Sequence, residues 1–282
     1  MNRFLSLLLT VSVIFLVSCK DDDTSQPIDE RTNSEVTGDV MATTIGQETG
    51  GAGIIAQDAA NLAEGFSFSN SVFTKGGVVT SLDSTYDPAT KTHTVILVRN
   101  KTFGLFSYNA TMRYHYIFYT GPLATASFTK GVTDKIMLSV NGRNQILTPR
   151  INSDDSSHGD FVVTGMAIGG AQPTMNGSYW RGGTNVLTKA LQGKSVTTDQ
   201  MINFINCLLN RTSDTTVSMT GTATATYNAT GSEGHTATRN IVAVFNGDGT
   251  ATLAMTRINQ GVTDSCMVDV KTGKWLKWIT TK

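Results

Sequence analysis

Apolar residues between Glu35 and Glu64 fall three or four positions apart, apart from an interruption by glycines at 46–53. This spacing is that of one face of a helix, so the segment predicts two short helices joined by a hinge. The segment is also rich in alanine and glycine, which favours close packing of both helices against a sheet.

From Ser67 onward, apolar and polar residues alternate, which is the period of a half-buried strand. Within 103–119, for example, Tyr108 and Tyr114 share one face, while Arg113 and His115 lie on the other. The expected strands are 72–82, 94–99, 103–119, 123–129, 135–140, 143–147, 160–168, 215–228, 238–245, 250–256, 264–270 and 274–279.

Three segments interrupt this alternation. Asn141-Gly142 predicts a type I′ turn, because glycine adopts the positive φ that such a turn needs. The acidic run 154–160 is expected to be a polar hairpin loop, with a cation-binding loop as the less favoured alternative. The glycine-rich stretch 169–193 is expected to be a loop.

Residues 197–200 (TTDQ) form a capping box and predict a helix over 201–209. Its apolar stripe is expected to be buried against a sheet and consists of Met201, Phe204, Ile205 and Leu208. The fold class is therefore mainly β with minor α. We expect a large antiparallel curved sheet or a sandwich, with an N-terminal helical pair and one mid-chain helix. Residues 35–282 would form a single β-rich domain, with two similar halves dividing near residue 190.

The first 18 residues have the composition of a secretory signal peptide. Arg3 precedes an apolar run over 4–17 that is too short to span a membrane and leads to Ser18 and Cys19. The sequence 16–19 (LVSC) resembles the lipobox of bacterial lipoproteins. That resemblance implies cleavage before Cys19, which would carry a lipid and become the first residue.

Lys20, Asp21, Asp22 and Asp23 follow the cysteine directly. They resemble the lipoprotein export signal of Bacteroidetes-type bacteria, which directs lipoproteins to the outer face of the outer membrane. The resemblance covers residues 16–23 and implies a protein anchored in the outer membrane that faces the cell surface, with the periplasmic face as the alternative. Residues 19–34 would be a lipidated, disordered tether.

Net charge limits the kinds of partner that the mature chain attracts, and the compartment bears on the state of its cysteines. The mature chain would have 282 − 18 = 264 residues, and without Arg3 its net charge would be 21 − 22 = −1. Such a balance attracts neither nucleic acid nor an anionic membrane surface, so the expected membrane contact is the lipid on Cys19. Cys207 and Cys266 remain in a compartment that permits disulfides; we favour two buried free thiols over a bridge.

No stretch of the sequence carries a recognisable catalytic motif. G-x-S-x-G and H-E-x-x-H are both missing, the four histidines are scattered, and Glu233 is the only glutamate after residue 64. We therefore assign no catalytic, cofactor or metal residue and expect a non-enzymatic binding or structural module. The alternatives are a carrier or chaperone for an apolar ligand, and a hydrolase.

A ligand of such a module would be a glycan, a peptide or a protein. The candidate platform consists of exposed aromatic residues, although core packing is the favoured role of each: Tyr179, Trp180, Trp275 and Trp278. Trp275 and Trp278 are three positions apart and are expected on opposite faces of a strand. Ser84 and Thr215 lie in triplets that resemble the acceptor sites of Bacteroidetes-type O-glycosylation.

Overall fold

Two helices and thirteen strands make up the part of the chain that the computed structural model describes. That part is residues 30–66, 79–166, 172–187, 194–213, 216–232 and 234–279, without the side chains of 30–33 and Phe103. Strands make up most of the described residues and helices a small share, and the strands form one large antiparallel open sheet. The expectation of a mainly β fold with minor α is confirmed, and the arrangement is a curved sheet.

The helices are α1 (Glu30–Ile45) and α2 (Ala52–Ala63). The strands are β1 (Val79–Asp87), β2 (Thr92–Phe103), β3 (Phe106–Thr120), β4 (Leu123–Thr125), β5 (Lys135–Leu147), β6 (Ile151–Thr164), β7 (Thr174–Leu187), β8 (Ser195–Ser213), β9 (Thr216–Gly231), β10 (Thr236–Asn246), β11 (Thr250–Arg257), β12 (Thr263–Asp269) and β13 (Lys274–Trp278). Their order in the sheet follows the chain from β1 to β13, except that β4 pairs beside β3.

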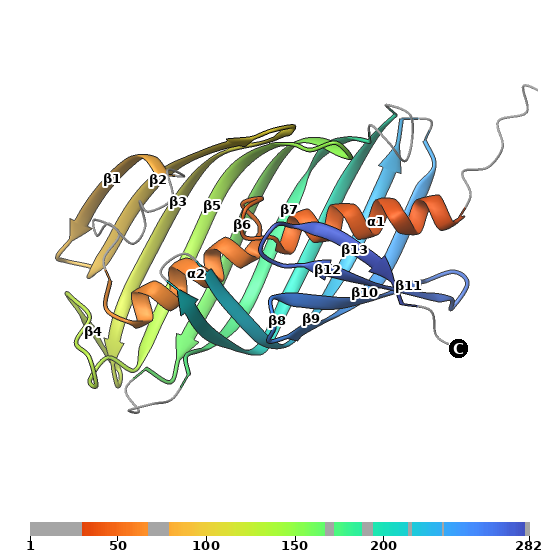
Figure 1. Ribbon diagram of the computed structural model, residues 1–282. Helices are drawn as coiled ribbons and strands as arrows, with labels where there is room; N and C mark the ends of the chain where they lie inside the picture. Colours follow the sequence, from red (N-terminus) through yellow and green to blue (C-terminus); the bar gives the residue numbers. More distant parts are fainter. Residues whose placement is uncertain are drawn as a thin grey trace, which may run out of the picture. The chain divides into compact units, whose positions relative to one another are not determined.

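The sheet curves around the two helices, which follow one another along its inner face (Figure 1). Helix α1 lies between distant strands, because Arg181 of β7 binds the carbonyl of Thr43 while Trp275 of β13 lies beside Gly38. From Ser34 to Ile45, every residue of α1 except Glu35 is buried. A helix buried on nearly all sides belongs to the core, so the helices fill the curve of the sheet.

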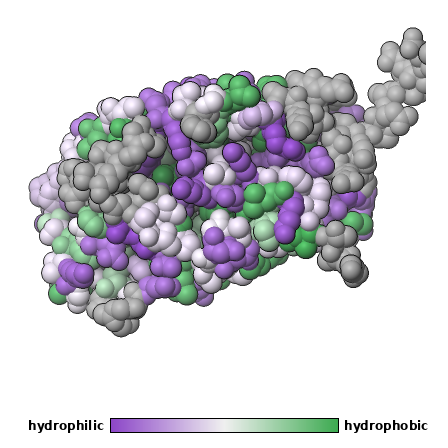
Figure 2. Space-filling view, viewed as in Figure 1, coloured by the Kyte–Doolittle hydropathy of each residue, from purple (hydrophilic) through white to green (hydrophobic). Residues whose placement is uncertain are grey.

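The side of the molecule seen in Figure 2 carries hydrophobic residues in small patches separated by hydrophilic ones. Most large apolar side chains of the strands instead face the helices, as the alternating burial along each strand shows. This is the expected outcome for an antiparallel sheet with one face on the core and one face in water.

Glycines connect the two helices, as the sequence predicts, and a further glycine ends α2. After α2, the amide of Gly65 donates to the carbonyl of Leu62, and that of Phe66 donates to Asn61. This is a Schellman motif, which requires the positive φ of 86° that Gly65 adopts. Between the helices, the amides of Gln47 and Glu48 donate to the turn between β12 and β13.

The predicted mid-chain helix is wrong, because residues 201–209 lie within strand β8. Phe204 faces the core, whereas Met201, Ile205 and Leu208 are exposed on the outer face. Asn206 has a positive φ of 50°, and the pairing with β9 shifts between Ile205 and Leu208. This bulge produces an apolar spacing that resembles a helix, while hydrogen bonds to β7 and β9 on both sides fix a strand.

The predicted turn at Asn141-Gly142 is also wrong. Gly142 lies in the middle of β5, paired with Met112 on one side and Ser157 on the other, and the hairpin turns only after Leu147. The expected loops at 154–160 and 169–193 are in large part the strands β6 and β7. Several of their inner positions are polar, among them Ser153, Asp155, Ser157 and Arg181, so the alternation of apolar residues that marks a strand is interrupted there.

Candidate functional site

Five arginines of the sheet and its turns extend toward the two helices. They bind carboxylates, backbone carbonyls or side-chain oxygens of α1, α2 and the segment between them, and they are Arg99, Arg150, Arg181, Arg211 and Arg239. Buried arginine is expensive unless it is paired and hydrogen-bonded. The helices supply these partners and are therefore necessary to the electrostatics of the interior.

The most enclosed of these contacts joins α2 to β2 and β3. Nη2 of Arg99 lies 2.9 and 2.7 Å from the two carboxylate oxygens of Asp58, and both side chains are only 2% exposed. The hydroxyl of Tyr114 donates to Asp58 at 2.6 Å and accepts from Nη1 of Arg99 at 3.1 Å. The three groups form a closed ring of charge-assisted hydrogen bonds.

Burial and charge pairing act in opposite directions on the pKa values of Asp58 and Arg99. Burial raises the pKa of Asp58, and Arg99 and Tyr114 pull it back only in part. Burial also disfavours the cation of Arg99, but the Asp58 carboxylate and the neighbouring tyrosines outweigh it, so the pKa of Arg99 is raised. Because Asp58 accepts three hydrogen bonds, the geometry supports the ion pair.

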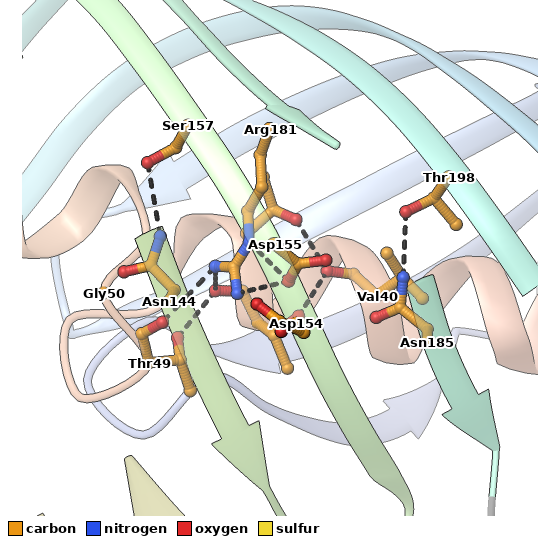
Figure 3. Close-up of polar contacts among 12 residues, drawn as sticks. Val40, Thr49, Gly50, Asn144, Asp154, Asp155, Ser157, Arg181, Asn185 and Thr198 are labelled. Atoms are coloured by element: carbon orange, nitrogen blue, oxygen red, sulfur yellow. Dashed lines mark hydrogen bonds and ion pairs between the residues drawn. The ribbon is translucent and has the colours of Figure 1, made fainter. Parts of the chain in front are cut away.

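A second cluster holds the end of α1 and is shown in Figure 3. Nε and Nη2 of Arg181 donate to Asp155 at 3.0 and 2.8 Å, while Nη1 donates to the carbonyls of Thr43 and Thr49 at 3.0 and 3.3 Å. Burial disfavours the guanidinium charge, but Asp155 together with the neighbouring Tyr179 and Tyr108 outweighs it, so the pKa of Arg181 is raised. Arg181 therefore fixes the carbonyl end of α1 to the sheet.

Uncharged side chains continue this polar layer. Thr44 of α1 donates to Gln200 of β8, and Asn185 donates to Thr198 at 2.9 Å. Sequence reasoning missed the layer, although one signal was present: Asp58 stands within the apolar stripe of α2, four residues after Ile54 and four before Leu62. A carboxylate at such a position needs a buried partner.

The predicted platform is divided between the two faces of the sheet. Tyr179 is wholly buried and donates to the carbonyl of Gly50 at 3.2 Å, so it cannot contact a ligand outside. Trp275 and Trp278 lie on the same face, because a register shift between Met267 and Val268 inserts a bulge between them. Their rings meet edge to face at 5.7 Å, and the expectation of opposite faces is wrong.

Trp180 alone of the four lies half-buried on the outer face near the middle of the sheet. Its ring stacks on His158 with centroids 4.9 Å apart, and its Nε1 donates to Asp199 at 3.1 Å. Gly182, two residues on, has no side chain and lies next to the six-membered ring of the indole. These contacts fix the indole against the sheet and present it among exposed polar side chains.

Other predicted residues can be placed briefly. Cys19, Lys20, Asp21, Asp22, Asp23 and Thr215 lie outside the described residues. Ser84 is exposed on β1, at the edge of the sheet. Cys207 and Cys266 are free and buried.

Two searches of the described residues found nothing further. No group of three or more His, Cys, Asp or Glu side chains within them is placed to hold a metal ion. No helix of the described chain is long and apolar enough to cross a membrane.

Comparison with known proteins adds no relative to this description. No family model matches the chain, and neither the curated proteins nor the solved structures contain a significant match.

Proposed function

We propose that this chain is a lipid-anchored, non-enzymatic binding protein of the bacterial outer membrane, and that it faces the cell surface. The anchor rests on the lipobox-like sequence 16–19 and on the acidic export-like sequence that follows it. The folded body rests on its own core, since the sheet and the buried helices form one compact unit from Arg31 onward. Such a body can present a fixed surface to ligands.

The observation that carries the proposed binding role is the fixed indole of Trp180. An aromatic ring on a sheet is preorganised for contact, because little conformational entropy is lost when a ligand settles on it. Its directly paired neighbours on the outer face are His158 of β6 and Met201 of β8. Exposed hydrogen-bonding groups lie around these: Asn141, Asp160, Asp199 and Asn203. The amide and imidazole groups offer both donors and acceptors of hydrogen bonds, and the carboxylates offer acceptors.

A glycan is the ligand class that best fits this surface. A sugar ring has an apolar face for the indole and hydroxyl groups for the amides and carboxylates around it. A peptide or a protein would use the same residues less completely, because the surface lacks a deep apolar anchor. We therefore place the ligand site on the outer face of β5–β8 around Trp180.

A binding assay with two matched variants tests the proposal. The mature protein, with Cys19→Ala to keep it lipid-free, is applied to a glycan array and the bound glycans are titrated. Trp180→Ala is expected to weaken binding by roughly tenfold or more, as loss of an aromatic anchor does. Tyr86→Ala removes another exposed aromatic residue, on β1, and should leave binding unchanged. Equal losses in the two variants, or an array without any bound glycan, would overturn the assignment.

A further inference from the structure

Buried guanidinium groups of the sheet face acceptors of the helices. This holds for Arg99, Arg181 and Arg239, and Arg181 also pairs with Asp155 of β6. Around Arg99, the inward residues of β2, β3 and β5 are mainly apolar. Such a surface would suit a molecule that combines an acidic group with a hydrocarbon chain.

We infer that the inner face of β2 and β3 is a binding site for a long-chain carboxylic acid, which α2 occupies as an internal ligand. Helix α2 offers the same chemistry as such an acid. Its Asp58 presents the carboxylate to Arg99 and Tyr114, while Ile55 and Leu62 supply buried apolar surface. A free acid that bound to Arg99 would replace α2 group by group.

The sheet builds the carboxylate site by itself. Nη1 of Arg99 is held by the hydroxyl of Tyr114 at 3.1 Å and by the sulfur of Met112 at 3.3 Å, and all three residues belong to paired strands. The site therefore keeps two donors in place, the guanidinium and the tyrosine hydroxyl, when Asp58 is absent. Its walls are the buried apolar side chains of neighbouring inward positions: Val95, Leu97, Leu138 and Val140.

The strand pairing of the sheet does not involve α2, although this helix also packs against β8 and β9. Each strand pairs with other strands only, and both helices precede β1 in the chain. Asp58 and Asn61 carry hydrogen bonds from α2 to the sheet, and no side chain caps the helix at Gly51. A ligand that competes for Arg99 therefore acts on a main polar attachment of α2.

The inner face continues beyond α2 toward an aromatic cluster that can receive the hydrocarbon chain. His93 stacks on Tyr116 at 4.8 Å, and Phe118 and Phe128 continue the cluster next to Gly65 at the end of α2. Tyr86 stands beside His93 and is 38% exposed, whereas Tyr116 and Phe118 are each 5% exposed, so the cluster reaches the surface of the described residues at Tyr86. The six steps along the strand from His93 to Arg99 span about 20 Å, close to the length of about 18 Å for α2.

Removal of the internal carboxylate gives the sharpest test. In the mature chain, Asp58→Ala should lower the melting temperature, and dodecanoate below its micellar concentration should restore it. Calorimetry should show that this variant binds dodecanoate roughly tenfold more tightly than the parent does, because Asp58 no longer competes for Arg99. Asp39→Ala is the matched control, since Asp39 is the buried carboxylate of α1 and pairs with Arg150 instead.

Dodecanol has the same length of hydrocarbon chain but no carboxylate, so it tests whether rescue depends on the acid group. Rescue of Asp58→Ala by dodecanol as fully as by dodecanoate, or equal rescue of Asp39→Ala, would overturn the inference. Arg99→Met combined with Asp58→Ala should abolish the preference for the acid. If Asp58→Ala does not fold, hydrogen exchange of the parent protein decides: dodecanoate should speed exchange of amides 52–63 while β2 and β3 stay protected, and unchanged exchange would refute the site.

Discussion

The guanidinium carbon of Arg150 lies 5.6 Å from the centre of the Trp275 ring. Arg150 belongs to the turn between β5 and β6, and Trp275 belongs to β13, far away in the order of strands. Nε of Arg150 also donates to Asp39 of α1 at 2.8 Å. One side chain thus links the middle of the sheet, its last strand and the enclosed helix, which shows how far the sheet curves.

Two adjacent residues of β8 distinguish the observed strand from the helix that the sequence predicted. Phe204 is 3% exposed and stacks on Phe245, whereas Ile205 is 46% exposed. We expect Phe204→Ala to lower the free energy of unfolding by about 3–5 kcal/mol, as in other buried aromatic truncations. Ile205→Ala should change it by only about 0.5 kcal/mol. Urea unfolding measures both, and similar large losses would contradict the strand and favour a helix with one buried stripe.

Two glycines with the same backbone conformation differ in the space around them. Gly50 has φ 66° and Gly104 has φ 58°. A Cβ on Gly50 would stand 2.4 Å from both Asn144 Oδ1 and Tyr108 OH, whereas no atom lies within 4 Å of one on Gly104. Gly104→Ala should cost about 1–2 kcal/mol through its backbone, and Gly50→Ala about 1–3 kcal/mol more through overpacking. Thermal melting should rank the two variants, and equal shifts would mean that Gly50 has room.

Two arginines bind consecutive aspartates from opposite faces of β6. Arg181 pairs with Asp155 at 2.8 Å and is 1% exposed, while Arg143 pairs with Asp154 at 2.8 Å and is 69% exposed. Arg181→Met removes the donor to the buried carboxylate of Asp155 and to the carbonyl of Thr49, while the carbonyl of Thr43 keeps the hydroxyl of Thr49. The substitution should therefore cost about 3–5 kcal/mol. Arg143→Met should cost at most about 1 kcal/mol. A chemical denaturation series that finds equal effects would show that the interior pair is solvated.

The two thiols make stability depend on alkaline pH. Burial raises the pKa of Cys207 from 9.0 to about 11 and that of Cys266 from 9.0 to about 12. From pH 9 upward, the unfolded chain releases thiol protons that the folded chain keeps, so the free energy of unfolding falls as pH rises through this window. The double variant Cys207→Ala, Cys266→Ala should show a flatter profile between pH 8 and about pH 11.

Thiol labelling tests the burial of Cys207 and Cys266 independently of the pH profile. Neutral buried thiols react slowly, since the thiolate is the nucleophile. Iodoacetamide at pH 8 should label the unfolded protein at both cysteines and leave the folded protein unlabelled. Rapid labelling of the folded protein would contradict the burial of these side chains.

The anchor is tested in cells. Cys19→Ala should abolish incorporation of labelled lipid and release the protein from membranes, because the lipid is its proposed attachment. Replacing Asp21, Asp22 and Asp23 with alanine should keep the lipid and reduce accessibility to protease at the cell surface. Membrane association that survives Cys19→Ala would end the lipoprotein proposal. Unchanged surface exposure in the second variant would leave the aspartates as a spacer only.

The sequence was sufficient to predict those helices and strands whose buried face is marked by their own apolar residues. Alternation revealed most strands, and the glycines at 46–53 marked the break between two helices that the structure confirms. Strands β6 and β7 escaped because their inner positions carry Ser153, Asp155, Ser157 and Arg181. Those polar groups are acceptable in the interior because partners from other elements satisfy them, and periodicity within a strand does not report such partners.

The candidate site was harder to predict for the same reason. Trp180 was identified as an aromatic residue of interest, but its platform depends on His158 and Asp199, which belong to the neighbouring strands β6 and β8. Asp58 and Arg99 are 41 residues apart and meet only because the sheet curves around α2. The register and curvature of the sheet bring these groups together, and neither can be read from the pattern of residues along a single sequence.

The agreement between strand order and chain order has a consequence for folding. Each strand of the long path pairs with a neighbour in sequence, so the sheet can grow by successive hairpins with short loops to close, a topology associated with fast folding. The helices behave differently: Ser34 binds Asp264, which is 230 residues later in the chain. During synthesis, the helices emerge first and must wait for the last strands before α1 is enclosed. Truncation at the C-terminal end would therefore leave a nearly complete sheet with its first helix uncovered.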